Sequence, residues 1–211
     1  NNRLDAKGRT ATAGAFRVNN ILVFYGIFKN FLKCIAKHLF LRRPFMFREM
    51  RRKKQALPAE EVSAILHRGT SGVLALSGDD DYPYAVPISY VFDGAKLYFH
   101  CAKDGHKLDA IQRSSKASFC VIDQDQIVPE KYTTYFRSVI AFGQIRIIQD
   151  EKEKRAAIEK LAKKYSPDED AAGRRKEIDR EWKTLCMLEM CIDHMTGKEA
   201  IELVKKRQEN N

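Results

Sequence analysis

The chain has 211 residues and a formal net charge of +10, but the charge is unevenly distributed. Residues 1–54 hold 14 Lys/Arg and 2 Asp/Glu, a net of +12, so residues 55–211 carry the remaining −2. A nucleic-acid-binding domain usually carries its basic patch on the folded body, so this distribution argues against a nucleic-acid partner. The length favours one domain of about 150–170 residues with an added segment.

The five cysteines, Cys34, Cys101, Cys120, Cys186 and Cys191, have no C-x-x-C spacing, and their number is odd. This pattern predicts neither a disulfide framework nor a zinc site, and we expect no bound metal. Reduced thiols that serve as small apolar side chains fit a cytoplasmic protein.

The first 45 residues precede Met46, the first methionine of the chain. The segment 21–41 is apolar, but Lys29, Lys33 and Lys37 fall on one helical face. Three lysines are costly inside a membrane-spanning helix, whereas a basic amphipathic helix can lie on a membrane surface. We expect residues 1–45 to be an extension outside the functional protein. A membrane-surface, partner-binding or targeting segment stays open as the alternative. Residues 46–211 then form the functional domain.

The first half of this domain contains alternating short strands and helices. Strict period-two alternation at Tyr84, Val86, Ile88, Tyr90 and Phe92 indicates a half-buried strand. Asp93-Gly94 after it is a strong hairpin signal. In chain order we expect a helix from Pro58 to before Gly69, a strand at 71–77, a turn at 78–81, a hairpin of strands 82–92 and 96–101, a helix at 105–113 and a strand at 117–123.

The second half begins with a polar segment at 124–133, which we expect to be a loop. The other expected elements are a strand at 134–149 bent at Gly143, a helix at 151–165, a polar connection at 166–176, a short helix at 177–183, a strand at 185–192 and a helix at 197–206 capped by Thr196. About six mostly antiparallel strands with flanking helices predict a mainly β fold, a small β-barrel.

A polar loop with a glycine opens the helix expected at 105–113. Gly105, followed by Lys107 in the first turn, can bind an anion through free backbone N–H groups and a cation. The hairpin before it therefore ends at a plausible phosphate-binding turn.

Three stretches of the sequence resemble one known family. They are PYAVPISYVFDG…LYFHCAKDGHK (83–107), YFRSVIAFGQIRII (135–148) and HMTGKEAIEL (194–203). In this order they resemble the flavin-binding split-barrel proteins related to pyridoxamine 5'-phosphate oxidase, and most closely the group that includes nitroimidazole reductases (Nim). The resemblance covers about residues 46–202. It implies a split β-barrel that binds FMN in a groove between the subunits of a homodimer.

The resemblance also implies which residues contact the cofactor. By this resemblance, the strand along the isoalloxazine ring corresponds to Val86, Pro87, Ile88 and Ser89, and the strand end beside the ribityl chain corresponds to Phe99, His100 and Cys101. The phosphate-binding turn corresponds to Gly105, His106 and Lys107, and the strand near the phosphate corresponds to Arg137 and Ser138. The closing C-terminal element corresponds to His194 and Lys198. Alternative interpretations stay open for five of these positions. Pro87 can be an ordinary edge proline, His100 a hydrogen-bonded strand histidine, Lys107 a solvated helix lysine, Lys198 a helix-start residue and Arg137 a member of a surface ion pair.

The chain shows no nucleophile–base constellation, so an enzyme of this sequence needs a cofactor to supply the chemistry. Catalytic residues are therefore not identified. The expected function is an FMN-dependent oxidoreductase that passes electrons from NAD(P)H or another donor to a small oxidised acceptor such as a nitroimidazole. A non-catalytic flavin sensor and a haem-binding protein with His100 or His194 as ligand are the alternatives. The C-terminal Trp and Arg pair of the pyridoxamine-phosphate oxidases is missing, because Trp182 is the only tryptophan, so vitamin B6 oxidation is not expected.

Overall fold

A computed structural model describes residues 47–209, and the described chain from Glu49 onwards forms one compact unit. The sequence-based expectations for residues 1–45 lie outside the described residues. Within the described range, no helix combines the length and the apolar character needed to cross a membrane.

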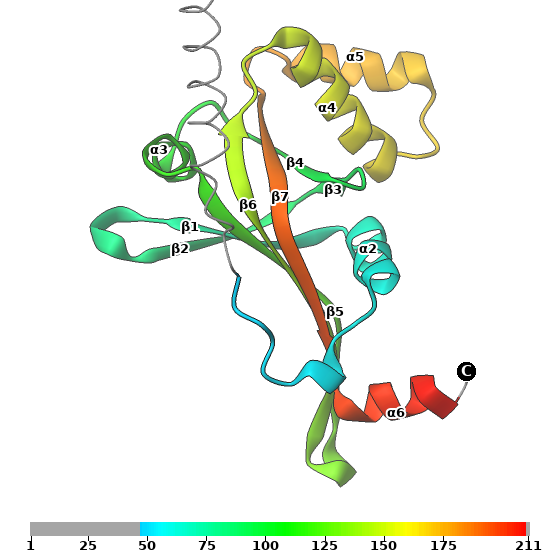
Figure 1. Ribbon diagram of the computed structural model, residues 1–211. Helices are drawn as coiled ribbons and strands as arrows, with labels where there is room; N and C mark the ends of the chain where they lie inside the picture. The colour runs from blue at the N-terminus through cyan, green and yellow to red at the C-terminus, as the bar shows by residue number, and fades with distance from the viewer. Residues whose placement is uncertain (1–46, 210–211) are drawn as a thin grey trace, which may run out of the picture. The chain divides into compact units, whose positions relative to one another are not determined.

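One antiparallel sheet of seven strands builds the unit (Figure 1). Its spatial order is β2-β1-β5-β6-β7-β4-β3. The strands are β1 (Ser71–Ser77), β2 (Pro83–Ser89), β3 (Val91–Phe92), β4 (Lys96–Cys101), β5 (Lys116–Val128), β6 (Thr133–Ile147) and β7 (Cys186–Glu199). The helices are α2 (Ala59–Arg68), α3 (His106–Arg113), α4 (Glu151–Tyr165), α5 (Ala171–Glu181) and α6 (Ile201–Glu209), with short 3₁₀ turns at Lys53–Gln55, Asp79–Asp81 and Pro129–Lys131. The expected split-barrel class is confirmed.

Tyr90 joins the two ends of this sheet. β2 and β3 are the outermost strands in the spatial order, yet only Tyr90 separates them in the chain. The sheet is therefore closed by one covalent link and not by a hydrogen-bonded ladder, which is why the barrel is split. The single strand expected at 82–92 is consequently two strands, which raises the count from about six to seven. Phe92 pairs with Leu97 across the expected Asp93-Gly94 turn.

The Tyr90 link depends on α4. The hydroxyl of Tyr165 accepts a hydrogen bond from Tyr90 N at 3.0 Å. The same hydroxyl lies 3.1 Å from Tyr90 O and also contacts Thr70 O, so it can donate to either carbonyl. The Tyr90 side chain is fully buried and meets Phe119 edge to face in the barrel core. A side chain 75 residues away thus satisfies the backbone that leaves the sheet.

Two hydrophobic clusters hold the helices on the sheet. The main cluster fills the barrel and includes residues of α2 and α3, among them Ile65, Leu66 and Leu108. The second cluster joins α4 to the outer side of β4 and β7 through Leu161, Tyr98, Met187 and their neighbours. α4 begins and ends at the expected residues, as do β1 and β4.

Two β-bulges interrupt the regular pairing of the long strands. Asp123 is an extra residue of β5, because Ile122 pairs with Ser138 while Gln124 already pairs with Arg137. The second shift lies between Phe142 and Gly143, as the sequence indicates for Gly143. A Cβ atom at Gly143 would lie 2.0 Å from the carbonyl oxygen of Cys191, so only glycine allows this close approach of β6 to β7.

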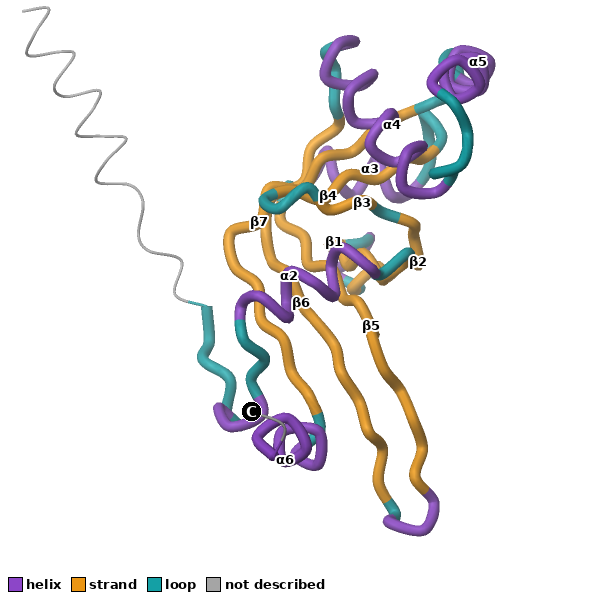
Figure 2. The backbone as a smooth tube through the Cα atoms, turned by 90° about the vertical axis from the view of Figure 1, so that its right-hand side faces the viewer, coloured by secondary structure: helices purple, strands orange, loops and turns teal. Residues whose placement is uncertain are grey.

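Three expected elements are wrong. The polar segment 124–133 is not a loop, because β5 and β6 continue their ladder through Val128 and Thr133. Residues 166–176 are not all connection, since Asp170 caps α5 and its side chain accepts from Gly173 N. The helix expected at 197–206 begins only at Ile201, because β7 extends to Glu199, and Thr196 is a strand residue and not a cap. Figure 2 shows how far β5 and β6 project as a hairpin beyond the other strands.

Glu189 joins β7 to its neighbours through two cations. Lys96 Nζ lies 2.9 Å from one carboxylate oxygen and Arg146 Nε lies 2.9 Å from the other. Burial alone would raise the pKa of Glu189, but the hydrogen bonds from Lys96 and Arg146 outweigh it, so the pKa lies below its ordinary value. The ionised carboxylate therefore stabilises the folded chain.

We expect Glu189→Gln to remove a pH-dependent part of the stability. Because the folded pKa is lowered, the contribution is present above the ordinary glutamate pKa and is lost as the pH falls below it. The variant should be less stable than the parent near pH 7, and the difference should shrink towards about pH 3, as measured by urea unfolding across this range. The exposed Glu177→Gln on α5 is the control. A pH-independent difference would contradict the role of the charge.

Tyr165→Phe tests the closing link. The variant keeps the ring but leaves the backbone of Tyr90 without its hydroxyl partner, so unfolding free energy should fall by about 1–2 kcal/mol in urea titrations. Tyr132→Phe, at a side chain that is 98% exposed, should leave it unchanged. Equal values for both variants would show that the hydroxyl of Tyr165 does not hold the link.

Candidate functional site

The outer face of the sheet carries a continuous row of small and apolar residues. The register places five residues directly opposite one another on five consecutive strands: Pro87, Val73, Cys120, Ile140 and Thr196. The neighbouring row consists of Ala85, Ala75, Ser118, Phe142 and His194. Cross-strand neighbours of this kind point to the same side of a sheet. We call these ten residues the outer face.

This face is incompletely covered within the chain. The side chain of Ile140 is 39% exposed, and that of Ile122, next to the face on β5, is 66% exposed. Isolated exposed apolar side chains are common, but a multi-strand apolar face is the kind of surface that binds a ligand or another chain. Pro87 lies on β2, an outermost strand of the sheet order, as its missing N–H requires.

Polar groups border the outer face on β6 and β7. Ser138 lies directly opposite Lys198, and the Lys198 ammonium is 5.3 Å from the ring centre of Phe136. His194 stacks on Phe142 with 6.4 Å between ring centres. Three predicted cofactor residues, Ser138, His194 and Lys198, are thus brought together along two neighbouring strands.

A second group of predicted residues meets where β4 ends and α3 begins. The His100 side chain is exposed, and the pKa of its imidazole is lowered by partial burial and by the nearby charge of Lys107. His100 is therefore neutral at physiological pH, and the cation of this corner is Lys107. Gly105 has φ +113°, a conformation that other residues rarely adopt, and its carbonyl accepts from Leu108 N at 2.9 Å to start α3.

His106 ties this corner to β2. Its ring stacks on Tyr84 at 4.1 Å between centres, and its Nε2 lies 3.5 Å from Asp79. The start of α3 is therefore held beside the β1–β2 hairpin through Tyr84, whose side chain lies on the core face of β2. The predicted turn and the predicted ring-binding strand are neighbours.

Other predicted residues point into the barrel. Val86 and Ile88 pack against the main core cluster, so their side chains face the barrel interior, whereas Ser89 lies on the same side of β2 as Pro87. Phe99 is fully buried against Phe119 and cannot present its ring to a ligand. Cys101 also packs against the core cluster and lies directly opposite Cys186 in the β4–β7 ladder.

Arg137 lies in a network of charges. Its guanidinium is 3.2 Å from the buried Glu199, and its other Nη atom is 3.7 Å from both Glu61 and Asp123. Arg68 binds Asp123 with two hydrogen bonds of 2.7 Å, and Arg207 lies 2.9 Å from Glu199. We call this set the arginine–carboxylate network: Glu61, Arg68, Asp123, Arg137, Glu199 and Arg207. Its three positive and three negative charges balance, so the contact between Arg137 and a phosphate remains a prediction.

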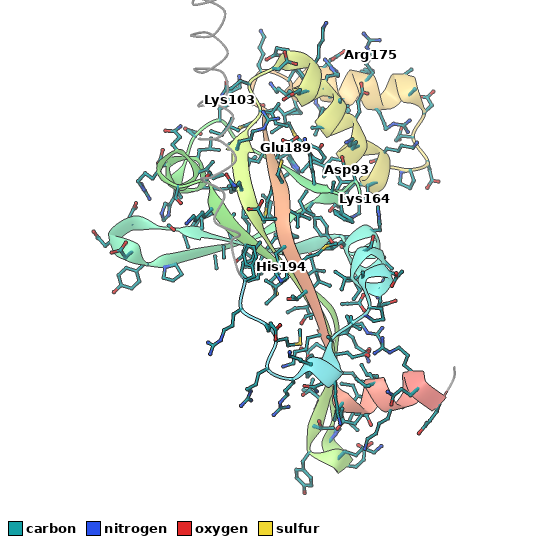
Figure 3. All side chains as sticks on the ribbon, in the orientation of Figure 1. Asp93, Lys103, Lys164, Arg175, Glu189 and His194 are labelled. Atoms are coloured by element: carbon teal, nitrogen blue, oxygen red, sulfur yellow. The ribbon has the colours of Figure 1, made fainter. Side chains whose placement is uncertain are left out.

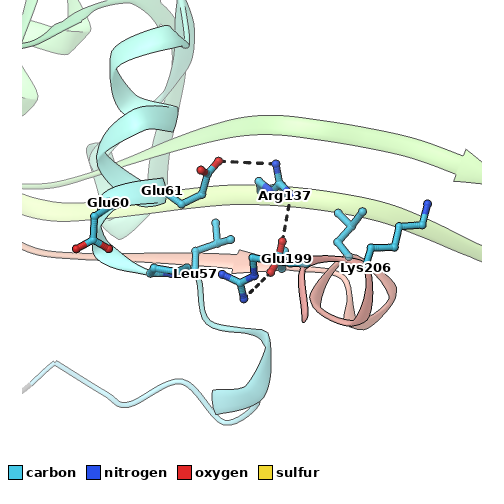
Figure 4. A pocket seen from close by; sticks show the side chains of 9 residues that line it. Leu57, Glu60, Glu61, Arg137, Glu199 and Lys206 are labelled. Carbon is cyan, nitrogen blue, oxygen red and sulfur yellow. Dashed lines mark hydrogen bonds and ion pairs between the residues drawn. The ribbon is translucent and has the colours of Figure 1, made fainter. Parts of the chain in front are cut away.

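The network lines a cavity of about 570 Å³ between α2 and α6 (Figure 4). Glu199, which has no exposed surface, lies beneath Arg137, while Lys206 lies at the side of the cavity. A smaller cavity of about 240 Å³ lies next to Thr196, lined mostly by apolar side chains such as Met50, Leu57 and Met195. The described residues contain no cluster of three or more His, Cys, Asp or Glu that could hold a metal ion.

The two groups of predicted residues lie far apart within one chain. His100 pairs with Met187 near the start of β7, whereas Lys198 lies near its end. Lys198 lies eleven positions after Met187 in the chain, roughly 36 Å along a fully extended strand. In Figure 3, His194 likewise lies farther than Glu189 towards the α6 end of β7. The two groups of predicted residues therefore lie near opposite ends of β7.

Comparison with known families identifies the fold's relatives. The model of the family described as pyridoxamine 5'-phosphate oxidase matches residues 58–199. The chain belongs to this family. The match begins just before α2 and ends with β7, so it covers every strand of the sheet. No curated protein matches the chain.

Solved structures share this fold at low sequence identity. A candidate 5-nitroimidazole antibiotic resistance protein from Bacteroides thetaiotaomicron is 20% identical with a TM-score of 0.57, over 68% of this chain and 86% of that one. The flavocytochrome Anf3 from Azotobacter vinelandii is 19% identical with a TM-score of 0.59, over 72% of both chains. An FAD and haem binding protein from Mycobacterium smegmatis is 22% identical with a TM-score of 0.57, over 70% and 73%.

Sequence reasoning missed most of the outer face. Val73 and Ile140 were not singled out, Cys120 was expected only to be a small apolar side chain and Thr196 a helix cap, although their alternation with buried neighbours was a usable signal in each strand. The register that aligns them is a long-range property. The partners of Arg137 were also missed, since Glu61 and Glu199 lie 76 and 62 positions away.

Arg137→Met tests whether this arginine is structural. The variant removes a partner of the fully buried Glu199, so unfolding free energy should fall by about 3–5 kcal/mol in denaturant titrations. Arg175→Met on the exposed side of α5 is the matched control and should change little. A variant that unfolds like the parent but binds flavin poorly would instead assign Arg137 to the phosphate.

Proposed function

We propose that this chain is a flavin-dependent oxidoreductase whose FMN lies on the outer face and is enclosed by a second copy of the chain. The observation that carries the proposal is the five-strand row from Pro87 to Thr196, which is partly exposed and bordered by cations. A flat, largely apolar ring system with one anionic end fits such a surface. Membership of the pyridoxamine 5'-phosphate oxidase family supports this assignment.

Lys107 is the proposed ligand of the phosphate at the start of α3. The first N–H groups of a helix have no acceptor inside the helix, and they attract anions together with a nearby cation. Gly105 has no side chain, and no atom lies within 4 Å of the position that its Cβ would take. The space beside the backbone at the start of α3 is therefore open to a ligand. The neutral His100 can donate or accept one hydrogen bond beside the ribityl chain without adding charge.

Two subunits are needed to complete the proposed site. The β4–α3 corner and the Ser138–Lys198 border lie near opposite ends of β7, and in this proposal they contact the same flavin from different copies of the chain. The exposed Ile140 and Ile122 give such a dimer apolar surface to bury. This arrangement makes the site a property of the pair of chains.

The flavin would accept and release electrons, and the residues of this chain would position it and keep water from the ring. The acceptor in this proposal is a small oxidised compound such as a nitroaromatic, and NAD(P)H is the donor. No dinucleotide fingerprint is present in the sequence, so NAD(P)H would bind only transiently over the ring.

An absorption spectrum of the purified full chain is the decisive experiment. Flavin bands that bleach anaerobically with NADPH and return on addition of a nitroimidazole are the expected result. Flavin bands that no donor bleaches would assign a sensing role, and a Soret band would assign haem. A colourless chain that takes up no added FMN would overturn the proposal.

Substitution of the two border cations tests the two-chain site. Lys107→Ala and Lys198→Ala should each weaken FMN binding by about 1–3 kcal/mol, the scale of a charge-assisted hydrogen bond, in fluorescence titrations. Lys103→Ala, an exposed lysine in the loop before Gly105, is the control. Mixing the two variant chains should restore one intact site per dimer, whereas separate sites in each chain would give no recovery.

A further inference from the structure

Two cysteines lie directly opposite each other where β4 ends. Cys101 and Cys186 form the last pair of the β4–β7 ladder. In the same ladder, Ile192 N donates to Ala95 O, so the opposing residues Ala95 and Ile192 form a hydrogen-bonded pair. Because such pairs alternate, the pair of Cys101 and Cys186 is of the same kind, with Cα atoms about 5.5 Å apart. This separation lies within the range that a disulfide spans.

Their side chains point to the same side of the sheet. Both belong to the main barrel cluster, Cys186 as a buried member and Cys101 as a half-buried one. The register places the two side chains next to each other across the ladder. Burial, followed by the neighbouring thiol of Cys186, raises the pKa of Cys101 to about 12, although the charge of Lys107 counteracts part of this increase.

We propose that Cys101 and Cys186 form a reversible disulfide within the chain when hydrogen peroxide oxidises them. The sulfur of Cys101, the more exposed of the two, attacks hydrogen peroxide and becomes a sulfenic acid as water leaves. The Cys186 thiol then displaces the hydroxyl group as a second water, and the S–S bond forms. Two thiols are oxidised by two electrons, and one peroxide is reduced to two waters.

The position of the pair links its oxidation to the candidate site. Cys101 is the last residue of β4, and the loop to Gly105 and Lys107 follows it directly. A bond to Cys186 would fix this loop to the start of β7. The source of peroxide rests on the proposed function, because reduced flavins release peroxide when oxygen takes their electrons. The geometry of the cysteine pair does not depend on the proposed function.

The test uses the full chain, prepared with and without added FMN, treated with hydrogen peroxide and alkylated before mass spectrometry. We expect the peroxide-treated chain to take up two fewer alkyl groups than the untreated chain, a peptide linking Cys101 to Cys186, and full reversal by dithiothreitol, whether or not FMN is present. The rate should rise roughly tenfold per pH unit between about pH 7 and pH 9, since only the thiolate reacts and the thiol pKa lies above this range. Cys101→Ser should abolish the link, and Cys191→Ser, at the exposed cysteine of β7, should keep it.

Cys186→Ala provides the same test if Cys101→Ser does not fold. Thiols that both remain open to alkylation after peroxide, or a link from either cysteine to Cys120 or Cys191, would overturn the proposal. Oxidation of Cys101 to a sulfinic acid without a bond would also overturn it. A disulfide that forms in a chain unable to bind FMN would uphold the pair and refute only the proposed function.

Discussion

The buried carboxylate of Glu199 is the constraint on which this architecture depends. It has no exposed surface, and a charge in such a place is tolerated only when cations compensate for it. Arg137 and Arg207 supply the compensation, and Arg137 also contacts Glu61 and Asp123. The arginine–carboxylate network therefore joins α2, β5, β6, β7 and α6 at one point. It places the end of β7, and with it Lys198, relative to the rest of the sheet.

The two faces of β6 and β7 have different roles, one in the charge network and one beside the candidate site. Arg137 and Glu199 are neighbours on the side of the network, while the next residues along each strand, Ser138 and Lys198, face the other side. The alternation of a strand thus separates a charge network that stabilises the fold from polar groups that remain available to a ligand. The bulge at Asp123 is part of this division, because the extra residue directs a carboxylate towards Arg68 and Arg137.

The sequence predicted the local elements well and the long-range contacts poorly. β1, β4 and α4 have the expected bounds, because alternation, turn residues and the helical stripe are local signals. Residues 124–133 were expected to be a loop because their side chains are polar, whereas the ladder between β5 and β6 is made by backbone groups. Gly197 suggested a helix start, but its carbonyl accepts from Leu57 N, and Leu57 and Val62 fill the space beside it. The candidate turn at Gly105 and Lys107 followed from a local pattern, a glycine and a cation at a helix start, whereas the outer face follows from register alone.

The single-residue link at Tyr90 has a topological consequence. The strands are hydrogen-bonded in order from β2 through to β3, and the chain passes from one edge strand to the other through Tyr90 alone. Most surface loops of a domain can be cut and their ends moved without loss of the fold, because other contacts hold the pieces. A cut beside Tyr90 would separate the two edge strands in the chain, and the buried Tyr90 ring and the Tyr165 hydroxyl would be among the contacts left to hold them together. Circular permutation at this point would therefore distinguish a barrel held by its covalent connection from one held by its core.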